Sequence, residues 1–523
     1  MLGIAAVLLG ASLATFFGRL LSVGIGDLRG ALQLDADSGS WIGTTYNMGM
    51  MFIGPFSVYL GGLLGPRRVL LGAAALFSLL CFVMPFAGHF AMLLLLLVLA
   101  GLSAGTFYPL TLSFILRNLP QKYLHYGIAA YAIDIVVTTH VAHSYEGWLM
   151  SSLSWRWIFW TTALLTPIMI GLVIFGIPRQ PLPQPKPGQP SPSWRGFLYA
   201  SLGAALLYGA LDQGVRLDWW RSGTFVAMVV SGSFLILAAA VRHFIRPNPL
   251  VNFPFLRRRN TLLLSSVVIL FRFVLLASVV LVPSYLGAIK GYRPEQTGPV
   301  LLWLALPQFL AGLLAVYLLG RIDARIIVAT GFGLVAVGCL MNAQISSVWS
   351  GSSFEMSQLV LALGEGFAFN GMVGSIVLTV VGSGEMTNAS AVLSFGGFFQ
   401  TIRLFGGELG ASFIQFFLHS RQVFHADLLS ANIQGGSPSV IARTRMLTAG
   451  MHTQAPTQDI AAGRAAILFA GSIRQQAFTL SIMDGFMLIA CAATACLLIV
   501  TCLKTLNVGF KQFIAASAAE KSA

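Results

Sequence analysis

Charged residues are scarce in this chain. Asp, Glu, Lys and Arg make up 9% of its 523 residues, whereas hydrophobic residues make up 56%. Soluble domains carry roughly 25% charged residues, so this composition excludes one large soluble core. Apolar runs of about 20 residues recur along the whole length, and each is long enough to cross a membrane as a helix. Because such runs are too long for barrel strands, the sequence predicts an all-α polytopic membrane protein.

Cysteines and nucleotide-binding signatures are also few. The five cysteines all fall within apolar runs and lack metal-ligand spacing, so we expect buried, small hydrophobic residues. The chain has no G-x-x-x-x-G-K-[ST] phosphate-binding loop, so ATP-driven transport is unsupported. We expect no cofactor and no enzymatic activity.

Acidic residues are outnumbered, 17 against 31 basic ones, which gives a net charge of +14. In a soluble protein this balance would suggest a nucleic-acid partner. Here, if both termini are cytoplasmic, seventeen Lys and Arg lie in cytoplasmic segments and eleven on the opposite side. That bias is typical of membrane topology, so we expect a lipid environment and no nucleic acid.

The apolar runs predict fourteen membrane spans, an even number that agrees with both termini on one side. The first run has neither a basic start nor a clear cleavage site, so we interpret it as an uncleaved span. The predicted spans cover residues 2–25, 41–63, 69–87, 91–116, 127–150, 157–177, 195–214, 222–241, 261–288, 297–319, 325–343, 356–381, 389–416 and 478–503.

Two long connections organise these spans. Residues 178–194 are rich in proline, and we expect an extended cytoplasmic linker there. Residues 417–477 are expected to form an external loop, in which "SRQVFHADLLSANI" predicts an amphipathic helix lying on the membrane surface. The resulting units are a six-helix bundle at 1–177, the linker, two extra spans at 195–241, a basic cytoplasmic loop at 242–260, a second six-helix bundle at 261–503, and a cytoplasmic tail at 504–523.

Several short motifs, in this order, resemble the fourteen-helix drug:H+ antiporter branch of the major facilitator superfamily. They include "GGLLGPRR" after span 2, "WRWIFW" before span 6, "GRIDAR" after span 10 and "TIRLFGGELGASF" in span 13. The resemblance implies two six-helix bundles plus two additional helices. It also implies proton-coupled efflux of small amphipathic organic compounds across the inner membrane by alternating access. A periplasmic adaptor protein and an outer-membrane channel are the partners that it suggests.

The resemblance assigns the two loop motifs to named residues. The first loop contains Gly61, Arg67 and Arg68, and the second contains Asp323 and Arg325.

At other signature positions this chain has residues that differ from those typical of the branch. Gly65 stands in place of the aspartate of the first loop, and Leu97 in place of an arginine tied to proton coupling. In span 5 the window of the glycine-proline antiporter signature reads "AHSYEG". The usual coupling groups are therefore absent or moved.

The same window holds titratable residues that have no place in an apolar run. On a helix, His140, His143 and Glu146 form a slanting stripe that covers an arc of about 120°. Three interpretations remain open: a solvated helix end, a weak metal site, or a proton-coupling or gating group. Asp134 is a further coupling candidate on another face of the same span.

Arg19 lies in span 1 at a depth similar to that of Glu146. We hypothesise an Arg19–Glu146 ion pair that forms in one access state. The candidates for the substrate cavity, all polar or aromatic residues within spans, are Tyr108, Glu365, Asn370, Arg403 and Glu408.

Two alternatives remain at this stage. The lost signature residues favour an exporter dedicated to one metabolite, siderophore or metal chelate, with altered proton coupling. An alternative from another class is a membrane sensor or enzyme that uses the His/Glu stripe as a metal centre.

Overall fold

A computed structural model describes residues 2–120, 123–179, 194–245, 259–382, 389–451 and 457–503. The described chain is almost entirely helical, as predicted. Most of the linker at 178–194, most of the loop at 242–260 and the whole tail at 504–523 lie outside the described residues. The α-helices are α1 (Leu2–Val23), α2 (Ile25–Leu32), α3 (Ala36–Leu64), α4 (Pro66–Val83), α5 (Phe90–Ala104), α6 (Phe107–Asn118), α7 (Leu124–Ser152), α8 (Trp157–Gly176), α9 (Trp194–Gly214), α10 (Gly223–Ile245), α12 (Arg259–Val274), α13 (Val282–Lys290), α14 (Pro294–Leu319), α15 (Ala324–Asn342), α16 (Glu355–Gly382), α17 (Ala389–Ala431), α18 (Pro438–Met451) and α19 (Gln458–Thr501).

Every predicted span coincides largely with helix, and three of the spans are interrupted. Residues 2–25 are divided at Gly24 between α1 and α2. Residues 91–116 are divided between α5 and α6, and residues 261–288 between α12 and α13, with the π-helical turn η4 (Ala277–Leu281) between them. Ten helical segments of the described chain are long and apolar enough to cross a membrane. The remaining predicted spans fall on α3, α7, α9 and α17, so the count of fourteen stays a prediction.

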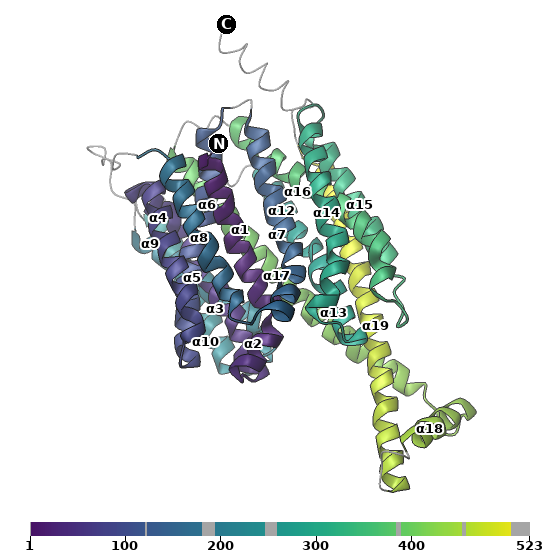
Figure 1. The fold of residues 1–523 in the computed structure, drawn as a ribbon. Coiled ribbons are helices and arrows are strands. Elements are labelled where there is room, and N and C mark those ends of the chain that lie inside the picture. The colour runs from purple at the N-terminus through teal and green to yellow at the C-terminus, as the bar shows by residue number, and fades with distance from the viewer. Residues whose placement is uncertain are drawn as a thin grey trace.

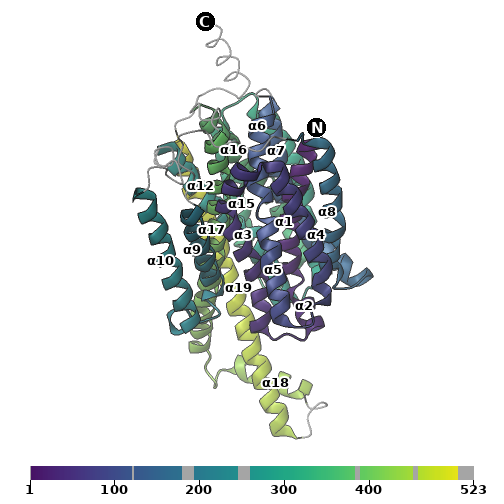
Figure 2. The same cartoon turned by 90° about the vertical axis from the view of Figure 1, so that its left-hand side faces the viewer.

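The long helices form two groups that meet along two seams (Figure 1). At one seam α7 packs against α14, and at the other α3 packs against α17. Helix α9 packs against α3 and α10, and α10 lies at the edge of the bundle outside α9 (Figure 2). The start of α1 and the end of α19 lie at the same end of the bundle (Figure 1).

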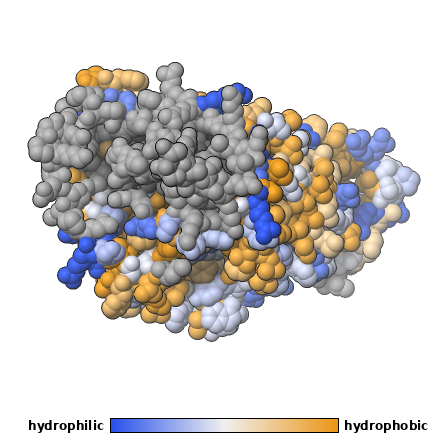
Figure 3. All heavy atoms as spheres, turned by 90° about the horizontal axis from the view of Figure 1, so that it is seen from above, coloured by the Kyte–Doolittle hydropathy of each residue, from blue (hydrophilic) through white to orange (hydrophobic). Residues whose placement is uncertain are grey.

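Hydrophobic residues are prominent on the coloured part of the surface seen from above (Figure 3). Phe175, Phe244 and Phe234 expose 83%, 80% and 68% of their surface. Contiguous exposed apolar surface of this kind is suited to lipid rather than to water.

The segment 417–477 differs from the expected loop. Its first part continues α17, α18 follows, and its last part begins α19, so that a helical protrusion extends from the bundle (Figure 1). The stretch "SRQVFHADLLSANI" extends α17 and does not form a separate helix on the membrane surface. The stretch packs on a neighbouring helix instead of on the membrane surface, because α17 packs on α19. Asp484 of α19 contacts Arg421 Nε at 2.6 Å and His425 Nε2 at 2.7 Å.

The cysteines also depart in part from their predicted burial. Cys81, Cys339 and Cys496 are buried, but Cys491 and Cys502 are exposed. Cys491 lies on the exposed face of α19, opposite the face that buries Ala493 and Cys496, and Cys502 directly follows the helix.

Candidate functional site

A buried polar contact joins the two helix groups near the middle of the α7–α14 seam. Nε2 of His140, on α7, lies 3.3 Å from Oε2 of Glu365, on α16, and both side chains are fully buried. The alignment is not that of a hydrogen bond, so the contact is electrostatic. The Glu365 carboxylate also accepts hydrogen bonds from Ser278 Oγ at 2.7 Å and from Gln308 Nε2 at 3.0 Å. We call His140, Ser278, Gln308 and Glu365 the seam cluster.

Local sequence explains why Glu365 is buried at this point. It is flanked by Gly364 and Gly366, and a Cβ on Gly364 would lie 2.7 Å from Val335 of α15. A Cβ on Gly366 would lie 2.9 Å from Ala311 of α14. Because neither glycine has a side chain, both neighbouring helices approach α16 closely and enclose the carboxylate.

Ser278 reaches Glu365 from a distorted turn. It belongs to the π-helical turn η4, which directly precedes Pro283 near the start of α13. Proline has no backbone N–H and clashes with the preceding turn, so a local widening of the helix is expected there. π-Helical turns are frequent at functional sites.

The predicted stripe on α7 does not converge on one site. His140 faces Glu365, whereas the Glu146 carboxylate lies beside Gly24, where a Cβ would be 2.9 Å from Glu146 Oε1. Among the residues described, no group of three or more His, Cys, Asp or Glu side chains is placed to hold a metal ion. The three residues therefore face different surroundings.

The hypothesised Arg19–Glu146 ion pair is not formed in this conformation. The charged groups near Glu146 are acidic, namely Asp27 and Glu295. Arg19 lies near His143 instead. The physical reason is the break between α1 and α2: Glu146 contacts Gly24, and five residues turn a helix by roughly 140°, which points Arg19 elsewhere.

Three arginines from three helices gather around Tyr108 of α6. The guanidinium carbon of Arg403, on α17, lies 3.9 Å from the centroid of the Tyr108 ring. Arg19 of α1 and Arg272 of α12 lie within electrostatic range of both Tyr108 and Arg403. The Tyr108 hydroxyl contacts the Thr15 hydroxyl on α1. We call Arg19, Arg272 and Arg403 the basic cluster.

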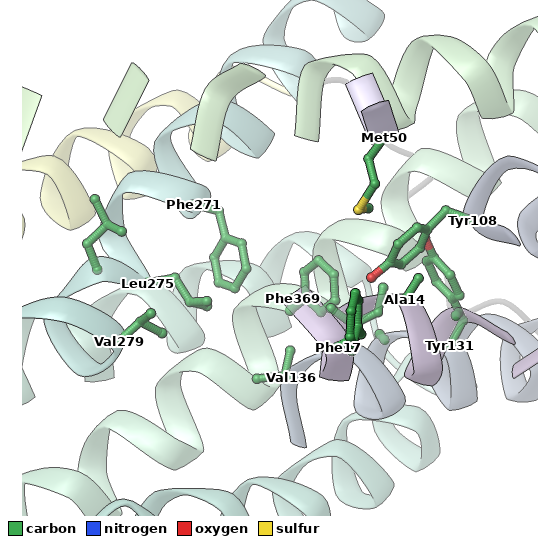
Figure 4. Packing of buried hydrophobic residues seen from close by; sticks show 14 of the residues in the cluster. Ala14, Phe17, Met50, Tyr108, Tyr131, Val136, Phe271, Leu275, Val279 and Phe369 are labelled. Atoms are coloured by element: carbon green, nitrogen blue, oxygen red, sulfur yellow. The ribbon is translucent and has the colours of Figure 1, made fainter. Parts of the chain in front are cut away.

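Apolar and aromatic side chains from both helix groups belong to the same buried hydrophobic cluster as Tyr108 (Figure 4). Met50 and Tyr131 come from α3 and α7, and Phe271 and Phe369 come from α12 and α16. The rings of Phe271 and Phe369 are stacked, with centroids 5.1 Å apart and planes at 8°. Tyr108, against which Arg403 stacks, therefore belongs to a buried hydrophobic cluster that both helix groups supply.

Two acidic sites complete the buried polar centre. Glu408 of α17 contacts the carboxyl group of Asp212 on α9 and the hydroxyl of Tyr208. Asp212 also accepts a hydrogen bond from the Thr44 hydroxyl. Two carboxyl groups in contact are stable together only when one carries a proton. Asp134 of α7 accepts a hydrogen bond from Ser12 of α1, and its second oxygen has no partner.

The predicted cavity residues differ in whether their partners lie on other helices. Arg403 and Glu408 have partners on different helices, as their five-residue spacing predicts. Asn370 donates only to the Gly366 carbonyl of its own helix, at 2.7 Å, and its side-chain oxygen is buried without a partner.

The two loop motifs differ in how they cap the helix that follows them. In the second loop, the Asp323 carboxylate caps α15 by accepting from Arg325 N at 2.9 Å, and it pairs with the Arg325 guanidinium at 2.9 Å. In the first loop, Gly65 takes the capping position with φ of 78° and has no side chain to cap α4.

The basic residues of the first loop bind main-chain carbonyls. Arg67 donates to Ile174 O at 3.2 Å, and Arg68 to Leu64 O at 3.4 Å. Gly61 is buried in the last turn of α3, and its carbonyl accepts a hydrogen bond from the Gly65 amide at 3.1 Å.

Ser278, Gln308, Asp212 and Arg272 are not among the site residues predicted from the sequence. A signal existed for Asp212 and Arg272, because a charged residue inside an apolar run usually faces a partner. Ser278 and Gln308 gave a weaker signal, since neutral polar side chains are common in membrane helices.

Comparison with known proteins identifies the chain. The Major Facilitator Superfamily model matches residues 7–410. The multidrug export protein EmrB of Haemophilus influenzae is 26% identical over 451 residues, which cover 82% of this chain and 83% of that protein. The probable multidrug resistance protein EmrY of Escherichia coli is 25% identical over 446 residues, which cover 82% of each. Among solved structures, the proton:xylose symporter XylE matches with a TM-score of 0.54 and 12% identity over 81% of this chain and 90% of that one, a likeness that concerns the fold. Since the family match spans most of its length, the chain belongs to the Major Facilitator Superfamily.

Proposed function

We propose that the protein is a secondary active transporter that exports small amphipathic organic compounds in exchange for protons. Its family and the multidrug export proteins among its relatives support this function. The buried polar centre lies between the two helix groups, where alternating access requires the substrate to bind. Neither an enzymatic activity nor a cofactor enters this proposal.

The observation that carries the proposal is the contact between His140 and Glu365. The two residues belong to different helix groups, so their contact depends on how the groups are placed. A protonated imidazole attracts a carboxylate far more strongly in a buried site than a neutral imidazole does. Proton binding therefore changes the relative free energies of conformations in which this seam is closed or open.

The test is transport in proteoliposomes with an imposed pH gradient and a fluorescent amphipathic dye as substrate. We expect the gradient to accelerate transport by the wild type. His140→Asn and Glu365→Gln should lose this acceleration and keep exchange in the absence of a gradient. His419→Asn is the matched control, because His419 is exposed on the extension of α17. Undiminished acceleration in both seam variants would contradict the proposal.

His143, Glu146, Arg19 and Asp134 are proposed as further coupling or gating groups. Their burial and lack of strong partners support such roles, since Asp134 and Glu146 have carboxylate oxygens without hydrogen-bond partners. His143→Ala and Glu146→Gln belong in the same assay. We assign an Arg19–Glu146 pair only to another access state, for which exchanging the two charges should recover part of the activity lost in either single variant.

We also propose an inner-membrane location with both termini in the cytoplasm. The excess of Lys and Arg on that side supports this orientation. The helical protrusion would then lie outside the membrane and could contact a periplasmic adaptor protein that leads to an outer-membrane channel. In a variant without the natural cysteines, Gly435→Cys should react with an impermeant maleimide added to the periplasmic side, and Arg68→Cys should react only after the membrane is opened.

A further inference from the structure

The three arginines of the basic cluster lack the partners that buried arginines usually have. Several arginines elsewhere in the described chain pair with carboxylates, for example Arg325 with Asp323 at 2.9 Å and Arg421 with Asp484 at 2.6 Å. No carboxylate of the described residues lies within ion-pair distance of Arg19, Arg272 or Arg403. Because charged groups inside a membrane protein are normally paired, this cluster carries uncompensated positive charge.

Its hydrogen-bonding capacity is also largely unused. Arg403 donates from Nε to Gln400 Oε1 at 3.1 Å and stacks on Tyr108. Nε of Arg272 is buried and has no partner. Arg19 is half-buried and makes no hydrogen bond to any described residue. A guanidinium group has five donors, so most donors of the cluster are free to bind a ligand.

The nearby carboxyl groups do not neutralise these charges. Glu408 and Asp212 contact each other and hydroxyl groups, and Asp134 accepts from Ser12. The charge left for a ligand in this centre is therefore positive.

We propose, on the basis of the transport function proposed above, that the substrate is an amphipathic organic anion. Its acidic head group binds between the guanidinium groups of Arg19, Arg272 and Arg403. Guanidinium groups bind carboxylate, sulfonate or phosphate oxygens in a bidentate geometry, and such bonds are strong in a buried site. The apolar part of the ligand lies toward the hydrophobic residues that share a buried cluster with Tyr108, among them Met50, Phe369 and Phe271 (Figure 4).

The test compares two probes that share one apolar chain and carry opposite permanent charges, decanesulfonate and decyltrimethylammonium. Both are measured as radiolabelled substrates in proteoliposomes, and both are tested for protection of the purified protein against thermal unfolding. We expect the wild type to transport decanesulfonate at least about tenfold faster than decyltrimethylammonium, and only the sulfonate to raise the unfolding temperature.

Substitutions of the arginines test whether the basic cluster binds the anionic probe. Arg272→Gln and Arg403→Gln should raise the half-saturating concentration of decanesulfonate by about tenfold or more, as expected for the loss of a charge-assisted hydrogen bond. Arg272→Lys should lie between them and the wild type, because it keeps the charge and loses the bidentate geometry. Arg443→Gln, on the exposed surface of α18, is the control and should leave transport unchanged.

The outcomes separate this inference from the transport function. If the protein exports decyltrimethylammonium and not decanesulfonate, the anion proposal is wrong and the transport function stands. If sulfonate export is unaffected by both glutamine variants, the assignment to the cluster is wrong. If neither probe is exported or protects the wild type, and the dye is not exported either, the transport function and this inference both fail. If the dye is exported while neither decyl probe is exported or protects, the inference alone fails. Should a glutamine variant not fold, the wild-type comparison of the two probes still decides the question of charge.

Discussion

At the residue scale, the closest helix contacts depend on glycine. A Cβ on Gly101 of α5 would lie 2.1 Å from the Tyr46 carbonyl oxygen of α3, and one on Gly49 would lie 2.5 Å from the Val98 carbonyl oxygen. Both obstacles are backbone atoms, which cannot rotate away. Any side chain at these positions therefore forces α3 and α5 apart.

We predict that Gly101→Ala lowers the free energy of unfolding by about 1–3 kcal/mol, as expected for an overpacked helix contact. Thermal unfolding of the purified protein in detergent measures the change. Gly72→Ala in α4 is the control, since no atom lies within 4 Å of its added Cβ. The control should be neutral or stabilising by up to about 1 kcal/mol, because alanine favours helix over glycine. Equal loss of stability in both variants would show that the α3–α5 contact is not the cause.

The sequence located buried titratable residues more reliably than their partners. Glu365 and His140 were both predicted as functional because each interrupts an apolar run, and the structure brings them together. The Arg19–Glu146 pair proposed for one access state is not formed in this conformation, because the Glu146 carboxylate lies beside Gly24, five residues beyond Arg19. Which side chains meet depends on helix rotation and on such breaks, and neither can be read from hydropathy.

At the element scale, the ends of α4 and α15 show how one substitution changes a loop motif. Asp323 caps α15 and holds Arg325, whose guanidinium also donates to the Leu503 carbonyl at 3.1 Å. The second loop is thereby tied to the end of α19. The first loop has no such carboxylate, because Gly65 occupies its place.

We predict that Asp323→Ala costs about 1 kcal/mol of stability from the cap alone, and more from the released Arg325. The transport rate in proteoliposomes should fall as well, because the α14–α15 connection loses its attachment to α19. The reciprocal change, Gly65→Asp, should give no gain, since φ of 78° disfavours any residue with a Cβ. A rise in transport by Gly65→Asp would refute this account of the first loop.

The helices themselves were largely predictable, and their extensions were not. Hydropathy marks only the part of a helix that lies in the membrane, so it ended the prediction of span 13 at residue 416 although α17 continues to Ala431. The added turns are stabilised by Arg421 and His425, which meet Asp484 on α19. A contact between residues about sixty positions apart leaves no periodic signal in the sequence.

At the scale of the whole molecule, transport by alternating access requires the two helix groups to move at both seams. At the α3–α17 seam, a Cβ on Gly54 would lie 3.5 Å from Gln400 Cγ and 4.0 Å from Thr401 Oγ1. An added Gly54 Cβ is thus in van der Waals range of the γ atom of Thr401, and the Cβ atoms of a disulfide lie roughly 3.5–4.5 Å apart, so we choose Gly54 and Thr401 as the pair to cross-link. The seam can therefore be locked in the conformation described here.

We predict that Gly54→Cys combined with Thr401→Cys, with the five natural cysteines replaced, stops transport after oxidation. Reduction should restore it to the rate of the cysteine-free parent. Each single cysteine variant is the control and should respond to neither treatment. A cross-linked protein that transports at the parental rate would mean that substrate crosses without separation of α3 from α17. The rocking of the two helix groups, on which the roles of the seam cluster and the basic cluster both depend, would then have to be abandoned.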